Sequence, residues 1–250
     1  MKIVLSCIGI GLLSLFANNL ISQTTLDYKN RIHPEISDEF MVVSQNHHAT
    51  KIGYEILEQG GNAVDAAVAM GFALAVTLPR AGNLGGGGFM LIYDAKTNKI
   101  ASIDYRSAAP KSATSQMYLT DTGVVRFGHL VNAVPGTVAG LIKAHRVHGS
   151  LKLNQVMRPS IKLAQNGIKV SHDLNFVLNF GKQSMLENPV SKEKFYDKED
   201  SLKVNSLFKQ PNLAKTLKLI SNKGDEVFYK GQIAKWISED SLKNGGLITM

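Results

Sequence analysis

The sequence predicts a layered α/β (α+β) fold, and three neighbouring segments predict it. Residues Ala63–Leu78 read as an alanine-rich helix with few polar side chains, which indicates burial on most sides. Phe89–Tyr93 is an almost continuous apolar run, and Lys99–Tyr105 alternates as a returning strand. Two buried strands that follow an apolar helix indicate helices and sheet packed in layers.

The chain before this helix is expected to hold one short strand and one helix. Gln23–Phe40 is polar and poorly periodic, Met41–Gln45 is a strand candidate, and Ala49–Gln59 has helical spacing. Gly60-Gly61 ends that helix, because glycine accepts the left-handed conformation of a helix C-terminus.

The alanine-rich helix has clear start and stop signals. Asn62 is a good N-cap, and Asp65 stands three residues later, in the capping-box position. Pro79 stops the helix because it cannot donate a backbone hydrogen bond. The small side chains in between permit close approach to a sheet or to another helix.

Four consecutive glycines, Gly85–Gly88, lead into the first strand. A phosphate-binding loop needs Gly-Lys-Ser or Gly-Lys-Thr at the start of a helix, whereas a strand follows here and the next lysine is Lys96. A dinucleotide fingerprint needs a strand before the glycines and a helix after them, the reverse of this order. We therefore interpret the glycines as a tight bend where side chains would clash with a neighbouring backbone.

From Pro135 onward the sequence predicts mostly helices. Pro159 is expected to bend the second of them. The expected organisation is a strand and helix core over about 41–135 and a mostly helical part over 136–250. The helices are expected at Thr137–His148, Asn154–Asn166, Leu174–Leu186, Asn212–Asn222 and Gln232–Lys243.

Residues 1–22 predict a secretory signal peptide. Lys2 supplies a positive start, Ile3–Ala17 is an uncharged apolar run, and Ser22 is a plausible cleavage residue. A membrane anchor is the alternative, but the run is shorter than the ~20 residues that a spanning helix needs. We expect an exported protein, periplasmic or secreted, with residues 23–250 as a partial domain and no membrane contact after cleavage.

Composition narrows the function classes. The only cysteine, Cys7, lies in the predicted signal, so the mature chain would have no disulfide, cysteine nucleophile or thiolate metal site. The formal net charge is +8, but lysines after residue 190 are mixed with acids, as in Lys192-Glu193-Lys194. That pattern is typical of a solvated surface rather than a phosphate-binding stripe, so no nucleic-acid partner is expected.

The sequence gives little indication of a metal site, a serine hydrolase triad or a glycosidase carboxylate pair. His47-His48 would point to opposite faces of a strand and so rarely bind one ion, and neither a metal nor another cofactor is expected. The sequence has no Gly-x-Ser-x-Gly elbow of the kind that marks a Ser-His-Asp hydrolase. No particular pair of carboxylates stands out as a glycosidase pair.

Arg106 is the most informative single charge. It follows the alternating strand and precedes Ala109-Pro110, so we expect it at a sheet edge or in a cleft. A planar guanidinium there is suited to bidentate recognition of a carboxylate. An ordinary ion pair with Asp104 explains the residue equally well from spacing alone.

Eight blocks of sequence stand in an informative order. They are Asn62–Ala69, Gly85–Met90, Asp104–Arg106 with Ala109-Pro110, Pro135–Gly140, Pro159–Ala164 with Gly167, Asn212–Lys215, Phe228–Gly231 and Asn244–Thr249. Together they resemble the γ-glutamyltransferase (γ-glutamyltranspeptidase) family over roughly Met41 to the end. Any one block would be weak, whereas eight collinear blocks are specific.

This resemblance implies an N-terminal-nucleophile hydrolase fold, an αββα sandwich that is incomplete here and has a mostly helical second half. It also implies a precursor that cuts itself into a large and a small subunit, whose new N-terminal threonine attacks the γ-glutamyl amide. Water, an amino acid or a peptide then accepts the γ-glutamyl group of a glutathione-like substrate. Backbone amides of the small subunit would stabilise the oxyanion.

The resemblance assigns roles to few residues of this chain. Arg106 matches the arginine that binds the α-carboxylate of the γ-glutamyl group. The threonine nucleophile would lie beyond Met250, and Thr249 belongs to a block well before the cleavage site. We therefore expect no catalytic residue here, no activity of these 250 residues alone, and a small subunit from the same precursor as partner.

Two alternatives to this function stay open. A related acylase of the same architecture could act, for example, on acylated β-lactams. A non-enzymatic exported binding domain could retain the scaffold. A carboxylate-binding role of Arg106 favours a glutamyl substrate, and a threonine opening a strand after Met250 would distinguish an enzyme from a binding domain.

Overall fold

The structure of the protein, a computed structural model, describes residues 35–120, 123–124 and 127–250. The chain divides into two compact units, Met1–Phe40 and Met41–Met250, and every described helix and strand belongs to the second. The predicted signal peptide lies outside the described residues. No described helix combines the length and the apolar character that crossing a bilayer requires.

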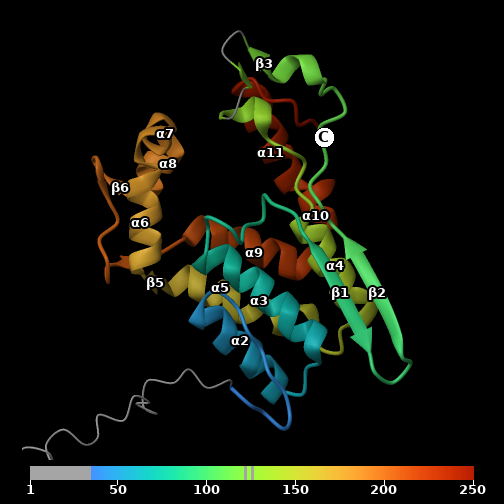
Figure 1. Ribbon diagram of the computed structural model, residues 1–250. Coiled ribbons are helices and arrows are strands. Elements are labelled where there is room, and N and C mark those ends of the chain that lie inside the picture. Colours follow the sequence, from blue (N-terminus) through green and yellow to red (C-terminus); the bar gives the residue numbers. More distant parts are fainter. Residues whose placement is uncertain (1–34, 121–122, 125–126) are drawn as a thin grey trace, which may run out of the picture. The chain divides into compact units, whose positions relative to one another are not determined.

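Helices α2 (His47–Glu58) and α3 (Ala63–Thr77) pack against each other (Figure 1). Helix α2 begins two residues earlier than predicted, because the side chain of Asn46 accepts the amide of His48 at 3.0 Å and caps the helix there. Gly60 has a φ of 84°, the left-handed conformation predicted for the end of this helix.

The predicted capping box at the start of α3 is confirmed. The Asn62 side chain accepts the amide of Asp65 at 3.0 Å, and the Asp65 carboxylate accepts the amide of Asn62 at 3.0 Å. Ten of the fifteen residues of α3 are buried, so the helix is enclosed on most sides, as its composition predicts.

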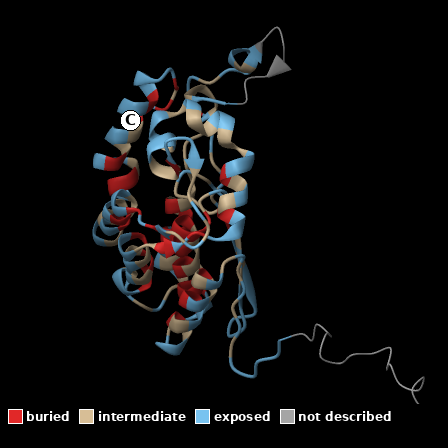
Figure 2. Cartoon of the chain, turned by 90° about the vertical axis from the view of Figure 1, so that its left-hand side faces the viewer, coloured by how far each residue is buried: buried red, intermediate tan, exposed pale blue. Residues whose placement is uncertain are grey.

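Two further helices pack on α3, and a third packs on one of these. Helix α3 contacts both α4 (Thr137–His148) and α5 (Leu153–Asn166), and α5 packs along α9 (Pro211–Lys223). Figure 2 shows the buried residues gathered in these helices. Their apolar side chains form one large core, which therefore lies around α3 rather than in a sheet.

Strands β1 (Phe89–Asp94) and β2 (Lys99–Asp104) form the predicted antiparallel hairpin. The inner side chain Ile103 is buried in the large core. On the outer face, Leu91 is 78% exposed and Tyr93 is 62% exposed. The expectation that the apolar strand β1 is covered on both faces is therefore wrong, because no described element packs on its outer face.

A second, smaller apolar cluster lies between Ile168 and Phe208. The predicted single helix Leu174–Leu186 is two helices, because the chain breaks at Gly181. The elements of this region are β5 (Ile168–Lys169), α6 (His172–Phe180), α7 (Lys182–Glu187), α8 (Pro189–Phe195), β6 (Tyr196–Asp197), β7 (Asp200–Ser201) and β8 (Leu207–Phe208).

The remaining elements are short, apart from α11. They are η2 (Ser115–Tyr118), β3 (Leu119–Thr120), β4 (Gly123–Val124), η3 (His129–Val131), α10 (Glu226–Tyr229) and α11 (Gln232–Lys243). Helices α4 and α11 have the predicted bounds, and the prediction of a mostly helical second half is confirmed.

The predicted strand Met41–Gln45 is wrong, because these residues are irregular and have no strand partner in the described chain. The Ser44 hydroxyl instead donates to the Asn46 carbonyl oxygen at 2.9 Å and lies 2.8 Å from the hydroxyl of Thr50. This segment therefore leads into α2. Helices α8 and α10 were not among the predicted elements.

Candidate functional site

Arg106 lies two residues beyond the end of β2 and is exposed. Its backbone amide donates to the Asp104 carboxylate at 2.8 Å. In the part of the chain that the structure describes, the Arg106 guanidinium forms no ion pair, whereas Arg80 and Arg146 each pair with an aspartate. The alternative of an ion pair with Asp104 is therefore not what the structure contains.

The glycine run forms one side of the segment that carries Arg106. The amide of Gly88 donates to the carbonyl oxygen of Tyr105 at 3.2 Å, and the amide of Tyr105 donates back at 3.0 Å. A Cβ atom on Gly87 would collide with the backbone nitrogen of Ser107 and lie 2.7 Å from the carbonyl oxygen of Tyr105. The predicted close approach of two backbones is thus confirmed at Gly87.

The start of α4 forms the other side of this segment. A Cβ atom on Gly136 would collide with the carbonyl oxygen of Tyr105, and one on Gly140 would collide with the Tyr105 ring. Ala108 and Val134 also form a backbone bridge, with hydrogen bonds of 3.1 and 2.8 Å. The backbone at Arg106 therefore lies between the glycine run Gly85–Gly88 and the start of α4, and both leave it little room to shift.

Hydrogen bonds join the glycine run to the start of α4. The amides of Gly136 and Thr137 both donate to the carbonyl oxygen of Gly86, at 2.8 and 3.1 Å. The hydroxyl of Tyr229 donates to the carbonyl oxygen of Pro135 at 2.9 Å and accepts the amide of Ala139 at 3.1 Å. These hydrogen bonds pair amides at the start of α4 that a helix by itself leaves unpaired.

Two half-buried tyrosines frame this arrangement. Burial raises the pKa of Tyr105, and burial also raises the pKa of Tyr229, so both phenols stay protonated at neutral pH. The Tyr105 hydroxyl lies 3.5 Å from the carbonyl oxygen of Phe89, at the limit of a hydrogen bond. The two tyrosines therefore add no charge beside Arg106.

The other candidate residues lie elsewhere. His47 and His48 begin α2, rather than a strand, with ring centroids 3.9 Å apart. Among the described residues, no group of three His, Cys, Asp or Glu side chains could hold a metal ion. Thr249 lies in the irregular segment after α11.

Sequence reasoning missed the part played by Tyr229. Its only signal was membership of the block Phe228–Gly231, which does not indicate that the hydroxyl reaches Pro135, 94 residues away. Gly136 and Gly140 also belonged to a family block. Their contact with Tyr105 becomes visible only when the hairpin and α4 are brought together.

Comparison with known proteins is consistent with this architecture. The structure is similar to that of the γ-glutamyltranspeptidase from Helicobacter pylori, with a TM-score of 0.83 and 41% identity over 87% of this chain and 64% of that one. It is also similar to a cephalosporin acylase from Bacillus halodurans, with a TM-score of 0.73 and 25% identity over 88% and 44% of the two chains. The fold is that of the N-terminal-nucleophile hydrolases, as predicted.

The family follows from the sequence match. The family model described as gamma-glutamyltranspeptidase matches residues 49–250. The chain is also 44% identical over 223 residues to the glutathione hydrolase proenzyme of Escherichia coli, and 39% identical over 221 residues to that of Bacillus subtilis. The chain belongs to the gamma-glutamyltranspeptidase family. It spans 38% of the length of each of these two relatives.

Proposed function

We propose that this chain is the N-terminal part of an exported γ-glutamyltransferase, or glutathione hydrolase, precursor. The complete protein would transfer the γ-glutamyl group of glutathione-like substrates to an amino acid, a peptide or water. Family membership and the 38% coverage of the relatives support this proposal. The threonine nucleophile would come from the part of the relatives that this chain does not span.

Arg106 is the residue of this chain that would bind substrate, through the α-carboxylate of the γ-glutamyl group. The observation that carries the proposal is the held backbone at Arg106 together with its guanidinium, which forms no ion pair among the described residues. A guanidinium offers two parallel donors to a carboxylate, and a fixed backbone lowers the entropy lost when they bind it.

Arg106→Ala in the complete precursor tests this role. A charged hydrogen-bonded contact of ~1.5–3 kcal/mol corresponds to roughly a tenfold to two-hundredfold rise in KM. Self-cleavage, followed as the appearance of two subunits on a gel, should continue. Arg106→Lys should restore part of the affinity, because a point charge lacks the fork geometry.

Arg146→Ala is the matched control, since Arg146 is an exposed arginine that pairs with Asp225 at 2.6 Å. Its KM should equal that of the parent. Unchanged steady-state kinetics of Arg106→Ala would refute the assignment. The 250-residue chain by itself should release no p-nitroaniline from a γ-glutamyl anilide above a blank.

A related acylase is the second candidate, because the cephalosporin acylase shares the fold at 25% identity. The higher identity to γ-glutamyltranspeptidases favours a glutamyl substrate, as does the Arg106 guanidinium, which forms no ion pair among the described residues. Assaying the complete protein with a γ-glutamyl anilide and with an acylated β-lactam separates the two. Faster turnover of the β-lactam would favour the acylase.

The outer face of the β1–β2 hairpin is the surface that we propose for the small subunit. Leu91 and Ile100 are 78% and 74% exposed there, although both side chains are apolar. Strand edges and apolar faces of this kind are normally covered in a folded protein. The other subunit of the same precursor would cover them.

A further inference from the structure

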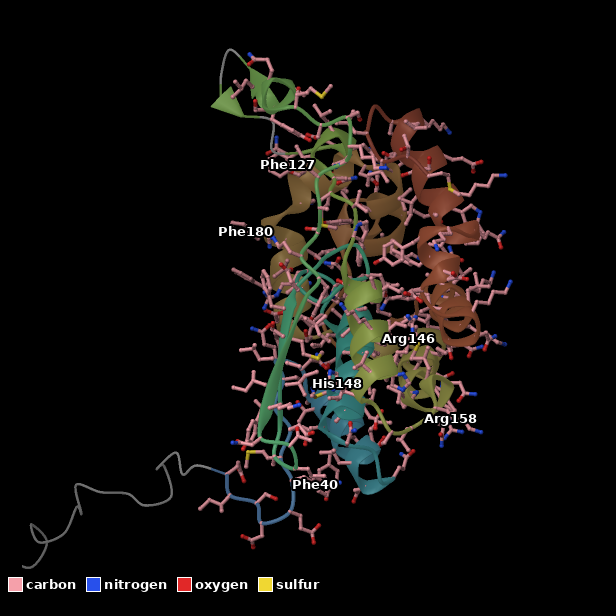
Figure 3. The ribbon with its side chains drawn as sticks, turned by 90° about the vertical axis from the view of Figure 1, so that its right-hand side faces the viewer. Phe40, Phe127, Arg146, His148, Arg158 and Phe180 are labelled. Carbon is pink, nitrogen blue, oxygen red and sulfur yellow. The ribbon has the colours of Figure 1, made fainter. Side chains whose placement is uncertain are left out.

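A basic groove runs between α5 and α9. It has a volume of about 420 Å³ and is lined by four cations, Arg158 and Lys162 from α5 and Lys215 and Lys218 from α9. Figure 3 labels Arg158, whose side chain projects outward from its helix. Side chains three or four residues apart share one face of a helix, so each helix turns its pair of cations toward the groove.

The framework of this groove is well packed. Helices α5 and α9 contact each other along their length, and both contribute fully buried residues to the large core, Val156 and Leu217 among them. Ala214, which lines the groove, is itself buried. The two helices that carry the four exposed cations are therefore fixed relative to each other by core packing.

Among the described residues, these four cations form no ion pair. No carboxylate lines the groove, and in the described part of the chain none of the seven ion pairs involves Arg158, Lys162, Lys215 or Lys218. Lys230 and Lys235, in contrast, each lie within 3.7 Å of a glutamate one turn away. Like charges gathered without counter-charge repel one another, and a bound anion would relieve that repulsion.

The remaining polar lining is neutral and can also hydrogen-bond an anion. Asn154 and Gln165 come from α5, and Ser221 and Asn222 come from α9. No aromatic side chain lines the groove, so the bases of a nucleic acid would find nothing to stack on. The lining therefore suits a chain of charged groups without rings.

We propose that this basic groove binds an extended, multiply charged phosphate anion, a soluble oligophosphate rather than a lipid headgroup. Lysine ammonium groups bind phosphate as point charges, and Arg158 can add a bidentate contact. The trough lies between two helices, where a linear anion can extend along both rows of cations. This inference goes beyond the proposed γ-glutamyl chemistry and does not depend on it.

Calorimetric titration of the complete precursor with inorganic tripolyphosphate at low salt tests the proposal. Lys215→Gln/Lys218→Gln should weaken binding by roughly fourfold to twenty-fivefold, about twofold to fivefold for each exposed charged contact removed. Lys230→Gln/Lys235→Gln removes the same charge from glutamate-paired lysines and should leave the affinity unchanged. Thermal melting of both variants reports whether they are folded.

Single orthophosphate and vesicles of an anionic phospholipid complete the experiment. Orthophosphate should bind at least tenfold more weakly than tripolyphosphate, because it reaches fewer cations, and raised salt should weaken the tripolyphosphate complex. Equal losses in the two double variants would show that net charge alone is responsible and would overturn the proposal. Vesicle binding that tripolyphosphate does not displace would overturn it too, as would the absence of tripolyphosphate binding to the folded parent.

Discussion

The hydroxyl of Tyr229 lies 2.9 Å from the carbonyl oxygen of Pro135 and donates a hydrogen bond to it. Because Gly136 follows Pro135 and lies directly against the carbonyl oxygen of Tyr105, this phenol fixes one wall of the segment that carries Arg106. A side chain from α10 thus supports a site formed by the hairpin and α4.

Tyr229→Phe should lower the free energy of unfolding by about 1–3 kcal/mol, since the Pro135 carbonyl and the Ala139 amide both lose their partner. Urea denaturation measures this loss. Tyr93→Phe is the matched control, because the Tyr93 hydroxyl reaches Asn98 at 3.1 Å on an exposed surface. The control should cost less than about 0.5 kcal/mol, and equal costs would contradict the role of Tyr229.

Gly140→Ala should destabilise the protein even though alanine is the better helix former. Helix propensity alone would favour alanine by up to ~1 kcal/mol, but its Cβ atom would meet the Tyr105 ring, and overpacking costs about 1–3 kcal/mol. Gly181→Ala is the control, with no atom closer than 3.5 Å to the added Cβ. Thermal melting should show a fall in Tm for Gly140→Ala and none for Gly181→Ala. A rise in the Tm of Gly140→Ala would mean that Tyr105 moves aside freely.

Local signals predicted most of the helices. The capping box at Asn62 and the glycine at Gly60 depend on neighbours within four residues, so the sequence carries all the information they need. The break at Gly181 was missed, because glycine inside an apolar pattern does not say whether a helix continues. Met41–Gln45 was wrongly predicted to be a strand, because a strand depends on a partner strand that sequence spacing cannot identify.

The candidate site was predictable only in part. Arg106 follows a strand and could be singled out, and the close approach at the glycine run was predicted from the absence of side chains. The link from Tyr229 to Pro135 could not be predicted, since it joins residues 94 positions apart. The open outer face of β1 could not be predicted either, because an apolar run does not say which element covers it.

The carboxylate of Asp65 makes the stability of the fold depend on pH. Burial would raise the pKa of its carboxyl, but the Ser150 hydroxyl at 2.6 Å and backbone amides, including that of Leu151, outweigh this and lower the pKa from its ordinary value. His145 Nε2 lies 3.6 Å from the same carboxylate. A lowered pKa in the folded state means that the stabilisation is complete above the unfolded pKa of about 3.9 and is lost as pH falls through the folded value.

Asp65→Asn should therefore cost about 1–3 kcal/mol at pH 7, and this cost should shrink as the pH falls below about 4. Urea denaturation at pH 7, 5, 4 and 3 measures both effects. Glu58→Gln, at an exposed position of α2, is the control and should change stability little at any of these pH values. A cost that stays constant down to pH 3 would show that the carboxylate charge contributes nothing.

The outer face of the hairpin should make the 250-residue chain self-associate. Leu91 and Tyr93 are 78% and 62% exposed on neighbouring outward positions of β1, and threonine keeps strand propensity while removing apolar surface. Leu91→Thr/Tyr93→Thr should therefore reduce both dye binding by exposed apolar surface and the sedimenting oligomer. Phe180→Gln, which removes an aromatic ring 86% exposed on α6, should change neither measurement as much.

In the complete precursor, where we propose that the small subunit covers this face, the double variant should instead lower stability, because the same side chains would then be buried. Equal stability of the variant and parent precursors would show that this face stays open.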